Sequence, residues 1–185
     1  MEKKENLTVK ETFTLALQNH QKNNIKVAEN LYEKILNTNP NHFQANLMLG
    51  TLSAQTKKFD VAIQLLQKAI KILPNNAVAY NNLGLVFKQL GKNKKAISYY
   101  QKAIEVDPKF VNGYCNLANI LNTLNNISEA KKYYEKALNL DPNKKEIYSN
   151  YVQVLFNLNQ HNKALKYYRK SYGFIRFTQK DFKVI

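Results

Sequence analysis

The stretch AVAYNNLGLVFKQLGKNKKAISYYQKAIEVDPKF, residues 77–110, contains two runs in which apolar residues recur every three or four positions. That spacing places the apolar residues on one face of a helix, so each run predicts an amphipathic helix. Gly91 lies between the runs, where a helix ends in a left-handed residue. Pro108 follows the second run and stops it, because proline has no backbone N–H to donate. We therefore predict an antiparallel helix pair.

The same unit recurs along the chain at a fixed interval. The four prolines, Pro40, Pro74, Pro108 and Pro142, are 34 residues apart. On that period the chain divides without gaps into the frames 9–42, 43–76, 77–110, 111–144 and 145–178. The positions equivalent to Gly91 include Asn23, Asn125 and Asn159, and asparagine also tolerates the left-handed conformation. A period of this length predicts an all-α solenoid, in which each helix pair packs on its neighbours.

The third frame resembles the tetratricopeptide repeat, whose pattern is W-x2-L-G-x2-Y, then A-x3-F, then P. The matching residues are Tyr80, which replaces the tryptophan, and Leu83, Gly84, Phe87, Ala96, Tyr100, Ala103 and Pro108. The other frames keep these positions less completely, and Arg176 stands where the fifth frame should have its proline. The resemblance covers residues 9 to about 172. It implies a right-handed superhelix with the first helix of each repeat along a concave groove and the second on the convex side.

The resemblance divides the chain into two parts. Residues 1–172 hold the five repeats, and residues 173–185 form an apolar tail, GFIRFTQKDFKVI, that has no helical pattern. The tail is either a cap on the last repeat or the first strand of a further domain, and both readings stay open. The array also resembles bacterial tetratricopeptide modules that precede transferase or oxygenase domains, where it would recruit substrates.

Asparagine recurs at one position of three successive frames. Asn82, Asn116 and Asn150 are each the sixth residue of their frame, 34 residues apart. This arrangement resembles the asparagine ladder in the tetratricopeptide arm of O-linked N-acetylglucosamine transferases, which grips the backbone of an extended peptide. A side-chain amide both donates and accepts, so it can pair with a peptide unit whatever the peptide's side chains are. We predict that all three face solvent, and that Asn112, Asn119 and Gln153 add polar contacts.

Two features of this groove have plainer interpretations. The chain is rich in asparagine overall, so an asparagine such as Asn81 is expected simply to lie on a solvated helix face. In the first two frames the groove positions are apolar: Phe13, Leu17, Leu47 and Met48. They form either an anchor pocket for a hydrophobic ligand side chain or part of the core.

The net charge of +15 allows a different function. Lysines of the second helices surround three tyrosine pairs, Tyr99–Tyr100, Tyr133–Tyr134 and Tyr167–Tyr168. Basic residues interleaved with aromatic ones suit single-stranded RNA or another anionic surface. Arginine, however, occurs only at Arg169 and Arg176, and the joint bias toward Lys, Asn, Ile and Tyr is also what an AT-rich genome produces. RNA or anionic-surface binding by the convex face is therefore the alternative hypothesis.

Nothing in the sequence suggests catalysis. His20, His42 and His161 lie in different frames without metal-ligand spacing, and no glycine-rich phosphate loop or nucleophile motif is present. The single Cys115 cannot form a disulfide within the chain, no apolar run is long enough for a bilayer span, and the first residues do not resemble a signal peptide. We expect a cytoplasmic, non-catalytic scaffold without cofactor or metal, which binds a protein or peptide partner; its oligomeric state stays open.

Overall fold

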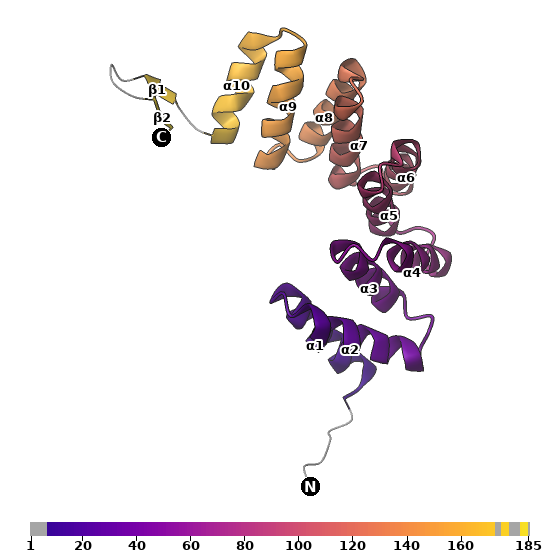
Figure 1. Ribbon diagram of the computed structural model, residues 1–185. Helices are drawn as coiled ribbons and strands as arrows, with labels where there is room; N and C mark the ends of the chain where they lie inside the picture. The colour runs from indigo at the N-terminus through magenta and orange to yellow at the C-terminus, as the bar shows by residue number, and fades with distance from the viewer. Residues whose placement is uncertain (1–6, 173–174, 178–181, 185) are drawn as a thin grey trace. The chain divides into compact units, whose positions relative to one another are not determined.

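The computed structural model describes residues 7–172, 175–177 and 182–184, and these form ten helices and two short strands (Figure 1). The helices are α1 (Val9–Gln21), α2 (Ile25–Thr38), α3 (Phe43–Gln55), α4 (Phe59–Ile72), α5 (Ala77–Gln89), α6 (Asn93–Val106), α7 (Val111–Thr123), α8 (Ile127–Leu140), α9 (Lys145–Asn157) and α10 (His161–Tyr172). The strands are β1 (Ile175–Phe177) and β2 (Phe182–Val184).

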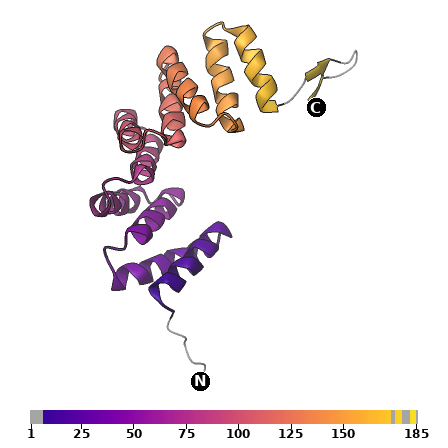
Figure 2. The same cartoon turned by 180° about the vertical axis from the view of Figure 1, so that it is seen from behind.

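The helices pair as the sequence predicts, which confirms the all-α class. The first helix of each pair begins at residue 9, 43, 77, 111 or 145, the first residue of a frame. Members of a pair run antiparallel, as α9 and α10 do in Figures 1 and 2. Among the described residues, no helix has both the length and the apolar character that crossing a bilayer requires.

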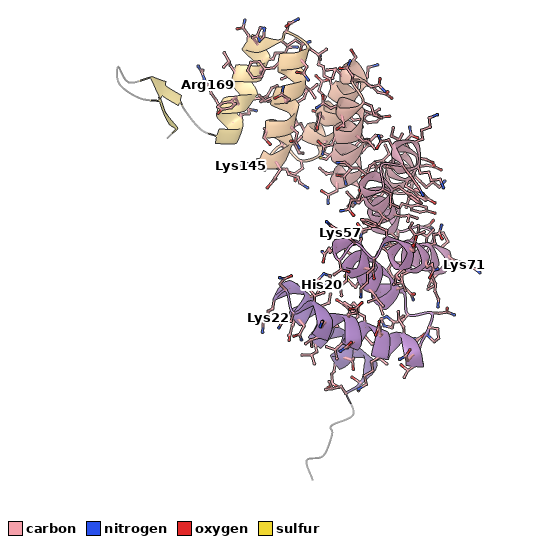
Figure 3. The ribbon with its side chains drawn as sticks, viewed as in Figure 1. His20, Lys22, Lys57, Lys71, Lys145 and Arg169 are labelled. Atoms are coloured by element: carbon pink, nitrogen blue, oxygen red, sulfur yellow. The ribbon has the colours of Figure 1, made fainter. Side chains whose placement is uncertain are left out.

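The turn inside each pair depends on one left-handed residue. Asn23, Gly91, Asn125 and Asn159 have φ values of 61°, 69°, 62° and 56°, as predicted. The second frame has Lys57 at this position with φ 60°, which the sequence analysis missed because lysine is an unusual residue there. Lys57 lies at the turn between α3 and α4 (Figure 3).

Small residues let the two helices of a pair approach closely. The twentieth residue of every frame is a fully buried alanine: Ala28, Ala62, Ala96, Ala130 and Ala164 are each 0% exposed. On the facing helix α3, a Cβ added to Gly50 would lie 2.9 Å from Leu66 Cγ, so α3 and α4 are too close for a larger residue. The core is built from these contacts and from buried tyrosines such as Tyr32 and Tyr134.

Side chains from the first helices also bind the turns that precede them. Asn46 Nδ2 donates to the carbonyl oxygen of Pro40 at 3.0 Å, and Tyr114 OH donates to that of Pro108 at 3.2 Å. Tyr148 OH makes the same bond to Pro142. All three donors are the fourth residue of their frame, where the repeat pattern has tryptophan. The tyrosines therefore keep a polar link that joins one repeat to the next.

The chain divides into two compact units, Met1–Tyr99 and Tyr100–Ile185, with the boundary inside α6. In the second unit, β1 and β2 pair antiparallel with Ile175 opposite Val184 and Phe177 opposite Phe182. The described part of the predicted non-helical tail is therefore a strand pair. The rest of the tail, residues 173–174, 178–181 and 185, lies outside the described residues.

Candidate functional site

Helix α7 brings three of the predicted site residues onto one face. Asn112, Asn116 and Asn119 are three or four positions apart, so they form a stripe along the helix. Asn112 is exposed, and the other two are half-buried. Lys144 Nζ donates to Asn112 Oδ1, and Tyr134 OH donates to Asn119 Oδ1. These two amides are thus held by partners from outside the helix.

Helix α9 packs beside α7 and carries a second polar stripe. Asn150 and Gln153, both predicted site residues, are exposed. Gln153 Nε2 donates to Asn157 Oδ1 at 3.2 Å, so Asn157 belongs to the same stripe. Sequence reasoning missed Asn157, although its spacing of four residues from Gln153 was a sufficient signal.

Asn82 lies in the other unit and is more enclosed than predicted. It is half-buried, and its Nδ2 donates to Thr51 Oγ1 of α3 at 3.0 Å. Thr51 Oγ1 in turn donates to the carbonyl oxygen of Leu47 at 2.7 Å. The prediction that all three asparagines face solvent therefore needs correction at Asn82, because α3 and α5 pack against each other, and also at Asn116, which is equally half-buried.

Asn81 also differs from its expected position. It is only 5% exposed, and its Nδ2 points to Asn82 Oδ1 at 3.4 Å. The interpretation of Asn81 as a residue on a solvated face was wrong. It follows that the adjacent residues Asn81 and Asn82 of α5 are at least partly structural, because both amides take part in internal hydrogen bonds.

The apolar groove positions of the first two frames belong to the core. Phe13, Leu17 and Met48 pack against a buried cluster formed by Ala16, Ala28, Tyr32, Leu49 and Leu52. Leu47 is 6% exposed, and Phe13 also contacts the rings of Tyr32 and His42. The core interpretation of these residues accounts for them better than an anchor pocket does.

The tyrosines of the three pairs are buried or half-buried. Tyr99 stacks on Phe87 with ring centroids 5.3 Å apart and planes 5° apart. Tyr133 lies 6.3 Å from Tyr114, and Tyr167 lies 5.7 Å from Tyr148. The second tyrosines Tyr100 and Tyr134 are 0% exposed. Five of these six rings are buried or contact other protein rings, and Tyr168 is half-buried, so the pairs offer little for base stacking, and this weakens the RNA hypothesis.

Lysines contact these rings as well. Lys95 Nζ lies 5.3 Å from the centre of the Phe87 ring, and Lys170 Nζ lies 5.7 Å from the rings of both Tyr148 and Tyr167. Such cation–π contacts are worth roughly 0.5–1 kcal/mol at exposed sites. Part of the basic charge thus stabilises the second helices on their neighbours.

The site offers hydrogen bonding rather than reactive groups. Burial raises the pKa of the Cys115 thiol to about 11, with the nearby Lys144 opposing this in part, so the thiol is protonated and a poor nucleophile at neutral pH. Within the described ranges, no group of three or more His, Cys, Asp or Glu residues is placed to hold a metal ion. The α7 and α9 faces are therefore suited to binding polar backbone or side-chain groups.

Models of the tetratricopeptide repeat family match residues 77–110, 111–144 and 133–166, and a further model described as TPR repeat matches 50–91. Together these matches span more than half of the chain. This protein belongs to the tetratricopeptide repeat family. Two of the matches have the same limits as the third and fourth frames. Tetratricopeptide repeat proteins generally mediate protein–protein interactions.

Several solved structures share the fold of this tetratricopeptide protein. The MamA protein is 22% identical with a TM-score of 0.72, and the match covers 88% of this chain and 89% of MamA. PilF of Pseudomonas aeruginosa is 21% identical with a TM-score of 0.82, covering 91% and 78%. A thermophilic TPR protein of Thermus thermophilus is 18% identical with a TM-score of 0.74, covering 89% and 90%. No curated protein gave a significant match.

Proposed function

We propose that this tetratricopeptide protein is a scaffold that binds an extended peptide through the side-chain amides of Asn82, Asn116 and Asn150. The observation that carries the proposal is the polar face of α9, where Asn150 and Gln153 are exposed on a first helix that packs beside α7. Surface amides regularly spaced on neighbouring helices suit a ligand whose own polar groups are regularly spaced. The backbone of an extended peptide has that property.

The expected affinity comes from several weak contacts. Each amide can donate to a peptide carbonyl and accept from a peptide N–H, and each such contact adds about 1 kcal/mol net. Because these bonds go to the backbone, the ligand's side chains matter little. The proposal thus agrees with the resemblance of the three asparagines to the ladder of O-linked N-acetylglucosamine transferases, and it predicts a sequence-tolerant partner.

Asn82 can form fewer hydrogen bonds to a ligand than an amide without internal partners. A side-chain amide has two N–H donors and two acceptor lone pairs. One N–H of Asn82 is engaged by Thr51, and Asn81 points to its oxygen. One donor and one lone pair therefore remain for a ligand, and we expect Asn82 to contribute less than Asn150.

A fluorescence-anisotropy titration with a labelled pool of random peptides tests the proposal. The variant is Asn82→Ala/Asn116→Ala/Asn150→Ala, and the matched control is Asn75→Ala/Asn143→Ala/Asn162→Ala, which removes three exposed asparagines outside the first helices. We expect the ladder variant to bind at least about tenfold more weakly at both low and high salt, and the control to bind as the wild type does.

Two other results would contradict the proposal. If the ladder variant keeps the affinity of the wild type, the three asparagines do not hold the peptide. If binding is lost steeply with added salt in every variant alike, the lysines rather than the amides carry it. Circular dichroism spectra of the variants establish that they keep their helix content.

A further inference from the structure

Two asparagines of α7 have their side-chain oxygens bonded to donors from outside the helix, and a third has its side-chain oxygen buried. Asn112 Oδ1 accepts from Lys144 Nζ, and Asn119 Oδ1 accepts from Tyr134 OH. Asn122 Oδ1 is buried and finds no donor among the described residues. Since the oxygen and nitrogen of an amide lie on separate branches of a planar group, an oxygen that is already engaged leaves the Nδ2 group directed away from its partner.

The bond from Tyr134 to Asn119 has no counterpart in the first repeat. Tyr32 occupies the equivalent position in the first frame and is also 0% exposed, yet its hydroxyl finds no partner among the described residues. The residue equivalent to Asn119 in that frame is Leu17, which has no side-chain acceptor. The hydroxyl of the buried tyrosine is thus bonded where the ninth residue of the frame is asparagine.

The hydroxyl of Tyr134 is able to donate at every physiological pH. Burial raises the pKa of the Tyr134 phenol well above its ordinary value, so the hydroxyl keeps its proton at any physiological pH. A buried O–H that must donate needs an acceptor, and the nearest one is Asn119 Oδ1. Flipping the Asn119 amide would reverse the bond, so that Nδ2 donates to the Tyr134 oxygen and the buried hydroxyl hydrogen loses its acceptor, at a cost of roughly 1–3 kcal/mol.

We propose that Tyr134 and Lys144 are positioning residues that turn Asn119 and Asn112 so that α7 presents N–H donors, and that a peptide bound there is held through its carbonyl oxygens. This inference rests on the proposed peptide-binding function and specifies how α7 recognises the ligand. It differs from a ladder of two-way amides, because Asn112 and Asn119 then select hydrogen-bond acceptors and are indifferent to the N–H groups of the ligand.

The variant that separates these two modes is Asn119→Asp. The two side chains have nearly the same shape, but aspartate replaces the amide N–H donors with an acceptor oxygen while still accepting from Tyr134. If α7 binds carbonyl oxygens, the change sets two acceptors against each other, and affinity should fall by more than it does in Asn119→Ala. If α7 instead binds ligand N–H groups, Asn119→Asp should bind as well as the wild type or better.

The positioning role of Tyr134 is tested by a separate comparison of peptide affinities. Tyr134→Phe removes only the hydroxyl and should weaken binding of the labelled peptide pool while Asn119 is present. In an Asn119→Ala background it should have no further effect, since there is no amide left to orient. Tyr100→Phe is the matched control, because Tyr100 holds the equivalent position and its buried hydroxyl has no partner among the described residues.

The titrations use the same labelled pool as above. We expect Asn119→Asp to weaken binding at least about tenfold, Asn119→Ala and Tyr134→Phe about threefold each, and Tyr100→Phe not at all. Retained or tighter binding by Asn119→Asp, or a Tyr134→Phe effect that persists without Asn119, overturns the inference. If the ladder variant remains weaker in that case, the proposed function survives. If the pool binds the wild type no better than the ladder variant, both proposals fail.

Discussion

Removing single hydroxyl groups from two equivalent tyrosines should have different effects on stability. Tyr32 and Tyr134 occupy the same position in the first and fourth frames, and both are 0% exposed. Tyr134 OH donates to Asn119, whereas Tyr32 OH has no partner among the described residues. Substituting phenylalanine for each removes the same atom from a similarly buried place, so the pair isolates the value of the hydrogen bond.

The expected magnitudes follow from the bond that each change removes. Tyr134→Phe deletes a hydrogen bond and leaves Asn119 Oδ1 without its partner, which should destabilise the fold by about 1–2 kcal/mol. Tyr32→Phe removes a buried hydroxyl that was already unsatisfied, so it should be neutral or stabilise by up to about 1 kcal/mol. For a chain of this size, 1 kcal/mol corresponds to a shift of roughly 2–4 °C in the melting temperature.

Thermal unfolding followed by circular dichroism at 222 nm measures both variants against the wild type. Because each repeat contacts mainly its neighbours, a local change need not reach the whole array. Amide hydrogen exchange in α2 and α8 therefore reports the effect where it arises. Equal destabilisation by the two substitutions would refute the reasoning, since the bond to Asn119 would then add nothing to the difference between the sites.

Three further predictions concern the turns, caps and close helix contacts. Lys57→Gly should raise the free energy of unfolding by up to about 1 kcal/mol in urea titrations, because glycine adopts the φ of 60° without strain; an unchanged or lower value contradicts this. Thr8→Ala should shorten α1 and make its helix content less dependent on pH. Hydrogen bonds from Thr8 lower the pKa of Glu11 in the folded state. The stabilisation from these bonds is therefore present above the unfolded-state pKa of Glu11 and is lost as the pH falls through its folded-state pKa. Circular dichroism across the acid range checks this, and equal acid sensitivity of variant and wild type counts against it. Gly50→Ala should destabilise by roughly 1–3 kcal/mol in the same urea titrations, because the new methyl group meets Leu66, and a variant as stable as the wild type would show that α3 and α4 can separate freely.

The helix pairs and their turns could be predicted because they depend on local sequence. The spacing of apolar residues indicates which face of each helix is buried. The residue types at the turns indicate the left-handed conformation of Asn23, Gly91, Asn125 and Asn159. The left-handed conformation of Lys57 was not predicted, because the helices on either side impose it although lysine rarely adopts a positive φ. The period, rather than the residue type, was the signal that could have found it.

The site was only partly predictable for a different physical reason. The spacing of three or four residues along a helix is enough to place Asn112, Asn116 and Asn119 on one face of α7. It could not show that Asn82 bonds to Thr51, because that contact depends on how α3 and α5 pack. Nor could it show which way an amide points, since the orientation of Asn119 depends on a hydroxyl fifteen residues away.

The central claim is that side-chain amides of the first helices contact the ligand directly. Two-dimensional 1H–15N NMR of the asparagine side chains, recorded while the unlabelled peptide pool is added, tests it without any mutation. We predict that the NH2 signals of Asn116 and Asn150 shift progressively with peptide, whereas those of Asn162 on α10 stay in place. Shifts confined to Asn162 and the lysines of the second helices, with Asn116 and Asn150 unmoved, would contradict the claim.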